Sequence, residues 1–414
     1  VCKADPLMIA VVLQSILAGL AAWTVGWVVR RVKQGNRMLQ MAAILFQFAV
    51  TLLNRFAAKR GSAYSDSILT EGLGLSLFVF FSVFLFLFIR TEKKRYLGFT
   101  LLFSFLLVSL RKQMMITLLV MGVVFAWYEL IRRRRIRRLL CLAVMVAAVL
   151  FASKLFDRAY QYLVRGVWME HSGNSMGILC TLLYSSDPER DVSLFEDETI
   201  RQLYLEIMEQ ADAQQILYPY AGSGWLTTAI HYADSYDAIG YGIINPVVEG
   251  YISEHFQCSA EEAAMKYDEI CNTMSNTLFR QEPLPLLRVY CYNTWQGLIN
   301  SVAKASHVLS LYAAGAYLIL AAAVCALIVQ KRKLEGQAAE RTGSSAQKYR
   351  DLAEQIDTSL CFAFVTMAGI LINAVVVGLI IFAQPRYMIY GMGLFYTACS
   401  MIAWDLYTCC RVRS

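Results

Sequence analysis

The sequence predicts an all-α polytopic membrane protein with a helical domain outside the bilayer. Of the 414 residues, 57% are hydrophobic and only 17% are charged, and the mean hydropathy is +0.47, which is high for a soluble domain. Nine apolar runs approach or reach the length that crosses a hydrocarbon core. Lysine and arginine cluster after every second run, which is typical of short cytoplasmic loops.

The order of apolar runs and basic clusters predicts the topology. The first run ends in "RRVK" and is expected to enter the cytoplasm, and the later runs alternate in direction. The segment "IRRRRIRR" is the strongest cytoplasmic signal. The nine predicted spans are residues 6–29, 38–56, 72–89, 97–110, 113–130, 139–156, 307–330, 359–383 and 389–407.

Three regions follow from this pattern. Residues 1–156 hold six predicted spans, and residues 307–414 hold three, with a polar cytoplasmic loop at 331–358. Residues 157–306 contain no span and are predicted to form a mainly helical extracytoplasmic domain. The whole chain is expected to be integral to the plasma membrane, most simply that of a bacterium.

Helix-start signals support the helical domain. Ser193 with Glu196, and Ser259 with Glu262, have the spacing of a capping box. The acidic run 196–198 could hold a metal, but consecutive helical residues point in different directions, so a solvated first turn is the better interpretation.

Composition excludes several classes. The net charge of +7 is explained by the basic loops, and no basic surface interleaved with aromatics predicts nucleic-acid binding. Eleven scattered cysteines lack C-x-x-C pairs, which argues against a zinc site or a disulfide scaffold. The histidines have no zinc-binding spacing, and no nucleotide-binding glycine motif is present.

Two acids precede the third predicted span. Asp66 and Glu71 stand before "GLGLSLFVFF", at its outer end. Asp66 is interpreted mainly as a solvated loop acid. Glu71 has two open interpretations: a carboxylate at a helix start, favoured by the helix dipole with Thr70 as a cap, or a member of a polar cavity.

Two cations stand at the tip of the hairpin formed by the fourth and fifth spans. Arg111 and Lys112 suit a phosphate, because arginine grips an anion through two hydrogen bonds and lysine acts as a point charge. Snorkelling to the membrane surface is the alternative.

The outer turn between the last two spans, "FAQPRYMIY", carries Arg386 and Tyr387. An arginine and a tyrosine there suit a phosphate or sugar hydroxyls, whereas anchoring in the aromatic belt is the competing interpretation.

Four stretches together resemble the type C membrane glycosyltransferases, the relatives of protein O-mannosyltransferases and of the lipid A aminoarabinose transferase. They are "DPLMIAVVLQSILAGLAAWTVGWVVRR", "YSDSILTEGLGLSLFVF" with Thr70 and Glu71, "FTLLFSFLLVSLRKQMMITLLVM" with Arg111, and "QPRYMIY". Each motif is degenerate alone, and their order carries the resemblance.

The resemblance implies transfer of a sugar from a polyprenyl-phosphate carrier to an extracytoplasmic glycan, lipid or protein acceptor in the cell envelope. It implies a catalytic acid in the first external loop, acting as a base or as the ligand of a divalent metal. That loop and the first span have no counterpart after Val1, so this chain is expected to be a fragment or an inactive homologue, and its catalytic residues are not assigned.

Two other functions remain open. A lipid or glycan transporter or flippase is expected to have charges or Gly/Pro breaks within its spans, and related halves. The sequence shows neither clearly, although Asn373 and Asp405 lie inside apolar runs, Asp405 near the cytoplasmic end. A non-catalytic envelope assembly subunit would bind a partner through residues 157–306. The glycosyltransferase hypothesis requires Glu71, Arg111 and Arg386 to lie close together, at the same depth on the extracytoplasmic side of the membrane.

Overall fold

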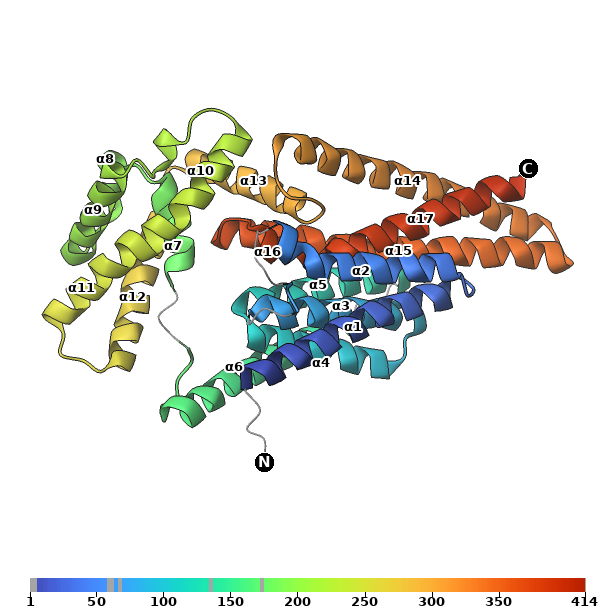
Figure 1. The fold of residues 1–414 in the computed structure, drawn as a ribbon, viewed down its shortest axis with the longest axis horizontal. Coiled ribbons are helices and arrows are strands. Elements are labelled where there is room, and N and C mark those ends of the chain that lie inside the picture. Colours follow the sequence, from blue (N-terminus) through green and yellow to red (C-terminus); the bar gives the residue numbers. More distant parts are fainter. Residues whose placement is uncertain (1–5, 58–62, 66–68, 134–136, 172–174, 414) are drawn as a thin grey trace. The chain divides into compact units, whose positions relative to one another are not determined.

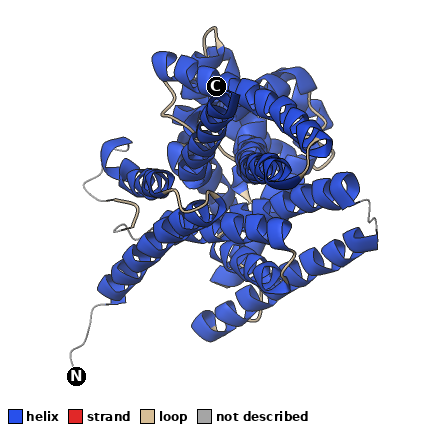
Figure 2. Cartoon of the chain, turned by 90° about the vertical axis from the view of Figure 1, so that its right-hand side faces the viewer, coloured by secondary structure: helices blue, strands red, loops and turns tan. Residues whose placement is uncertain are grey.

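The computed structural model describes residues 6–57, 63–65, 69–133, 137–171 and 175–413, and every regular element among them is a helix (Figure 1 and Figure 2). The all-α prediction is therefore confirmed for this part of the chain. The described residues divide into two compact units, one of residues 1–156, 299–373 and 385–414, and one of residues 157–298 and 374–384. We call them the apolar unit and the helical domain.

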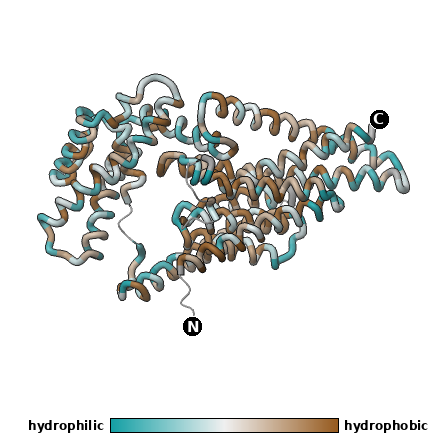
Figure 3. The backbone as a smooth tube through the Cα atoms, viewed as in Figure 1, coloured by the Kyte–Doolittle hydropathy of each residue, from teal (hydrophilic) through white to brown (hydrophobic). Residues whose placement is uncertain are grey.

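The apolar unit contains the predicted spans, apart from the last ten residues of the span at 359–383. Its elements are α1 (Pro6–Val32), α2 (Arg37–Ala57), α3 (Thr70–Thr91), α4 (Lys94–Leu110), η1 (Lys112–Met115), α5 (Ile116–Ala126), η2 (Trp127–Arg133), α6 (Arg137–Arg165), α14 (His307–Glu340), α15 (Gly343–Ile380), α16 (Pro385–Met388), η6 (Ile389–Gly391) and α17 (Met392–Arg413), with the ends of α6 and α15 belonging to the helical domain. In Figure 3, hydrophobic residues dominate most of the length of these helices.

Six segments of the described chain are long and apolar enough to cross a membrane. They are Leu7–Val32, Thr70–Thr91, Lys112–Ile131, Arg138–Arg165, His307–Glu340 and Ala346–Ile380. The predicted spans at 38–56, 97–110 and 389–407 are also helical, in α2, α4 and η6–α17, but they do not belong to these six. Length and composition thus support a membrane protein with six such helices.

Helix α3 is the centre of the apolar unit. In its most apolar window 89% of the residues are buried, against 17% in α6 and in α14. Leucine and phenylalanine cover α3 on all sides, and a helix that is apolar all round is stable only inside a core. It packs against α1 and α4, and the rings of Phe78, Phe81 and Phe86 are fully buried. The first turn of α3 is therefore held firmly in place.

A fully buried ion pair joins three parts of the apolar unit. Lys33, in the turn between α1 and α2, places its Nζ 2.5 and 2.7 Å from the two carboxylate oxygens of Asp405 on α17. The same Nζ donates a hydrogen bond to the Gln355 carbonyl of α15 at 3.2 Å. The two charged side chains are 0% and 1% exposed. Each charge is thus neutralised inside the protein.

The helical domain has a core of its own. Its elements are α7 (Met176–Ser185), α8 (Pro188–Asp191), η3 (Val192–Leu194), α9 (Glu198–Ala213), η4 (Tyr218–Tyr220), α10 (Trp225–Asp237), η5 (Ala238–Ile244), α11 (Asn245–His255), α12 (Ala260–Leu278) and α13 (Pro283–Asn300), the last two residues of which belong to the apolar unit. Helices α7, α9, α11 and α12 supply most of this core.

Two buried tyrosine hydroxyls in this core are hydrogen-bonded. The Tyr232 hydroxyl lies 2.6 Å from that of Thr181, and the Tyr204 hydroxyl lies 2.7 Å from that of Ser186.

Burial raises the pKa of the Cys271 thiol to about 12, and it raises the pKa of the Cys180 thiol as well. Both thiols are therefore protonated near neutral pH, which is typical of structural cysteines.

One of the two predicted helix starts is wrong. Ser259 and Glu262 form the expected capping box at the start of α12. Ser193, by contrast, lies in η3, and α9 begins at Glu198 with Asp197 as its N-cap. The Asp197 carboxylate accepts hydrogen bonds from Thr199 N at 2.8 Å and Ile200 N at 3.1 Å.

We expect Asp197→Ala to destabilise the first turn of α9 by about 1 kcal/mol, because two backbone N–H groups lose their acceptor. Amide hydrogen exchange at residues 199 and 200 measures this directly, and it should become several-fold faster. Ser193→Ala is the matched control and should leave the exchange unchanged. Faster exchange in Ser193→Ala alone would contradict the observed cap.

Candidate functional site

The start of α3 places Glu71 inside the apolar unit. Leu69 is the N-cap residue and offers no side-chain cap, so the expected capping role of Thr70 is wrong. Instead the Thr70 hydroxyl lies 3.3 Å from Glu71 Oε2. The Glu71 side chain is 4% exposed. A carboxylate that is this deeply buried needs a cationic or hydrogen-bonding partner to remain charged.

Arg111 is that partner. Helix α4 ends at Leu110, and Arg111 has an extended backbone, with φ −160° and ψ 128°, before η1 begins. At this break in the hairpin, Arg111 Nη1 lies 2.8 Å from Glu71 Oε1. The Arg111 guanidinium also lies over the ring of Tyr387, 4.3 Å from its centroid. One cation thus contacts both a carboxylate and an aromatic face.

Arg386 adds a second cation from the other end of the chain. Its Nε lies 4.0 Å from the same Glu71 oxygen, and its guanidinium lies 4.7 Å from the Tyr387 ring centroid. Nη2 of Arg386 donates to the Tyr387 hydroxyl at 2.6 Å. Pro385 starts the short α16 and so places Arg386 and Tyr387 in one turn of helix.

Amide side chains fix the backbone of that turn. The Asn373 amide of α15 donates to the Tyr387 carbonyl at 2.8 Å. Gln113 lies 3.3 Å from the Asn373 oxygen and 3.5 Å from the same carbonyl. Asn373, which interrupts an apolar run, is therefore bonded to the turn that carries Arg386.

A buried hydroxyl completes the group. Tyr390, in η6, is 2% exposed, and its ring lies close enough to Gly74 that a Cβ there would be 3.2 Å from it. Its hydroxyl lies beside Arg111, which can only donate, and near Glu71, but among the described residues its own proton has no hydrogen-bond acceptor. The Nε of Arg386 is likewise buried without a hydrogen-bond acceptor there. Two buried donors beside one carboxylate thus have no acceptor among the described residues.

The structure brings together four of the six predicted residues: Glu71, Arg111, Arg386 and Tyr387. Asp66 lies outside the described residues, and Lys112 is exposed beside Arg111. Sequence reasoning missed Tyr390, although its place three residues after Tyr387 puts both on one side of a helical turn. We call Glu71, Arg111, Arg386, Tyr387 and Tyr390 the Glu71 cluster.

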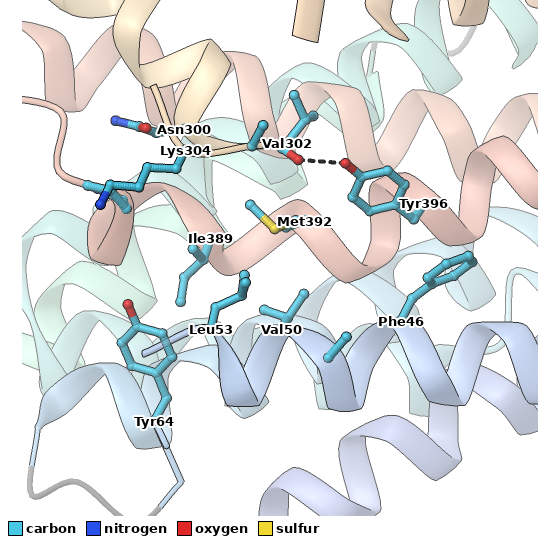
Figure 4. Close-up of a pocket in the computed structure, with 13 residues that line it drawn as sticks. Phe46, Val50, Leu53, Tyr64, Asn300, Val302, Lys304, Ile389, Met392 and Tyr396 are labelled. Atoms are coloured by element: carbon cyan, nitrogen blue, oxygen red, sulfur yellow. Dashed lines mark hydrogen bonds between the residues drawn. The ribbon is translucent and has the colours of Figure 1, made fainter. Parts of the chain in front are cut away.

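An apolar cavity of about 290 Å³ lies beside the turn that carries Arg386 (Figure 4). Pro385 and Ile389 line it, on either side of Arg386 and Tyr387 in the sequence. Its apolar lining comes mostly from α2 and α17, and hydrocarbon-lined cavities of this kind take apolar ligands in preference to water. The cavity and the Glu71 cluster therefore share the α16–η6 segment.

The cavity has one polar end. In Figure 4, Lys304, Asn300 and Tyr64 gather at one side, while the apolar residues fill the middle and the other side. The carbonyl of Tyr64 also lies 2.6 Å from the position of a Cβ at Gly72, next to Glu71. At the opposite side Tyr396 donates to the Val302 carbonyl at 2.6 Å and so ties α17 to the segment before α14. The polar end thus lies toward the start of α3.

The chemistry of the Glu71 cluster is that of an anion site. Two guanidinium groups face one carboxylate, so the three ionised side chains sum to one positive charge, and two further donors have no acceptor in the part of the chain that the structure describes. Guanidinium groups bind phosphate through paired hydrogen bonds. Among the described residues no group of three or more histidine, cysteine or acidic side chains is placed to hold a metal ion.

Comparison of the chain with protein-family models, with curated proteins and with solved structures found no match.

Proposed function

We propose that this chain belongs to a membrane glycosyltransferase that takes a sugar from a polyprenyl-phosphate carrier and transfers it to an extracytoplasmic acceptor. The observation that carries the proposal is the Glu71 cluster, in which residues separated by 315 positions meet at one carboxylate. A lipid phosphate needs cations at a fixed depth in an apolar protein, and Arg111 and Arg386 meet that requirement.

The neighbouring cavity supports a lipid carrier. A polyprenyl phosphate has an anionic head directly attached to a long hydrocarbon chain, so its site needs a cationic group beside an apolar hollow. The cavity is apolar over most of its lining and polar only where Lys304 and Tyr64 gather. Its volume of about 290 Å³ lies at the lower end of ligand pockets, enough for the first part of the chain.

The proposal includes a topology. With α2, α4 and η6–α17 as shorter crossings, nine spans place the starts of α3 and α5 and the α16 turn on the side opposite the basic loops. The helical domain then lies outside the cytoplasm, in the plasma membrane of a bacterium, where it would meet a glycan, lipid or protein acceptor. Glu71 is the acid positioned to orient the sugar or the acceptor hydroxyl.

The test uses the purified full chain in lipid nanodiscs. Binding of polyprenyl phosphate is compared with binding of the polyprenol of the same length, and we expect the phosphate to bind at least about tenfold more tightly, because a charge-assisted hydrogen bond is worth about 1.5–3 kcal/mol. Sugar-labelled polyprenyl-phosphate hexoses then test transfer to an envelope extract. Equal binding of phosphate and alcohol would overturn the proposal.

A lipid transporter is the second candidate, and the buried Lys33–Asp405 pair is the observation that favours it. Asp405 lies within a predicted span, and ionisable groups inside membrane segments often mark transport pathways. A transporter moves the labelled lipid across a vesicle membrane without cleaving the bond to the sugar. Release of the labelled sugar from its carrier separates the glycosyltransferase from the transporter.

A further inference from the structure

The Glu71 cluster holds an anion of its own. Glu71 Oε1 lies 2.8 Å from Arg111 Nη1 and 4.0 Å from Arg386 Nε, so this carboxylate occupies the position between the two cations. A carboxylate and a phosphate present similar oxygens to a guanidinium. An incoming phosphate and Glu71 therefore compete for the same donors.

The unused donors indicate that the carboxylate fills the site incompletely. The Tyr390 hydroxyl is buried and has no acceptor among the described residues, because its neighbour Arg111 can only donate. The buried Nε of Arg386 lacks a hydrogen-bonded acceptor in the same set of residues. A buried donor without an acceptor costs free energy, so its presence in a folded protein calls for a reason. A phosphate has more acceptor oxygens than a carboxylate and can satisfy both groups.

We propose that Glu71 is an internal placeholder, which the phosphate monoester of a membrane lipid displaces from Arg111 while it accepts hydrogen bonds from Tyr390 and Arg386. This inference rests on the proposed function and adds to it the order of events at the site. The Arg111–Glu71 contact keeps the carboxylate engaged until the phosphate arrives. Binding then releases Glu71 to face the sugar or the acceptor hydroxyl.

The placeholder has an unusual consequence for mutagenesis. Glu71→Gln keeps the shape of the side chain but removes the competing charge, so we expect a prenyl phosphate to bind at least about tenfold more tightly than to the wild type, since close charge pairs are coupled by about 1.5 kcal/mol or more. Glu354→Gln is the matched control, because Glu354 also pairs with an arginine, Arg90, at 3.3 Å, but lies outside the cluster. It should leave the affinity unchanged.

Tyr390→Phe tests the other half of the exchange. Removing a buried hydroxyl whose proton has no acceptor among the described residues should leave the melting temperature unchanged or raise it. The same change should weaken prenyl phosphate binding about tenfold, because a hydrogen bond to a charged group is lost. A role in packing alone would predict the opposite pattern, with a lower melting temperature and unchanged binding. This variant also decides the question if Glu71→Gln fails to fold.

The binding measurement uses the full chain in nanodiscs with three probes: farnesyl phosphate, phosphatidylglycerol and inorganic phosphate. We expect farnesyl phosphate to bind more tightly to Glu71→Gln, and more weakly to Tyr390→Phe, than to the wild type. If phosphatidylglycerol or inorganic phosphate shows the same changes in affinity, the ligand is not specifically a lipid phosphate monoester. If the wild type binds farnesyl phosphate but Glu71→Gln binds it no better, the placeholder is wrong and the proposed function stands. If none of the variants binds a phosphate, both are wrong.

Discussion

Arg111→Ala is expected to reduce sugar transfer from a polyprenyl-phosphate hexose by about a hundredfold, the value of one charge-assisted contact made to the lipid phosphate. Arg111 makes the shortest ion pair of the cluster and lies over the Tyr387 ring. Arg111→Lys keeps the charge but loses the paired hydrogen bonds and the stacking. Its transfer rate should therefore lie between those of the wild type and Arg111→Ala. Initial rates at fixed donor concentration measure the series.

A separate variant distinguishes lost function from lost folding. Without Arg111, the one ion-pair partner that the described residues leave to the buried Glu71 carboxylate is Arg386, at 4.0 Å, and an uncompensated buried charge can cost about 3–5 kcal/mol. Arg111→Ala combined with Glu71→Gln removes both members of the pair and should restore the melting temperature but not the transfer. Arg95→Ala, at the exposed start of α4, is the control and should behave as wild type. Normal transfer in the double variant would remove Arg111 from the site.

The sequence predicted those features that depend on the residues of a single segment. Hydropathy and loop charge are properties of each segment, and they located the apolar helices and the turns at Arg111 and Arg386. Because both turns follow predicted outward spans, their meeting with Glu71 at one depth could be expected before any coordinates. The same measures do not mark α2, α4 and α17 as membrane spans, since all three fall outside the six apolar segments of the structure.

The partners of each side chain could not be predicted, because they depend on how helices rotate and pack. Asn373 and Asp405 both interrupt apolar runs, yet one bonds to the α16 turn and the other to Lys33, a residue 372 positions away. Local context also overrode the capping rule at Ser193. The Phe195 side chain is 4% exposed and stacks on Tyr204, and its backbone is extended, so α9 starts only after it.

Asp405→Leu is expected to destabilise the protein by about 3–5 kcal/mol, because the buried Lys33 ammonium loses its only carboxylate among the described residues. Lys33→Met should have an effect of similar size, for the converse reason. Thermal unfolding in detergent, followed by circular dichroism, measures both. Arg158→Gln is the control, because its pair with Glu170 has side chains 46% and 34% exposed, and exposed pairs contribute about 1 kcal/mol or less.

The double variant Lys33→Met with Asp405→Leu decides whether this pair serves stability or transport. Replacing both charges with apolar groups of similar size removes their desolvation cost, so stability should return to the wild-type value or exceed it. If the pair is only structural, the double variant also retains sugar transfer. A double variant that folds normally but loses lipid movement would instead support the transporter. If the single variants have wild-type stability, the Lys33–Asp405 pair is not buried in the membrane-embedded protein.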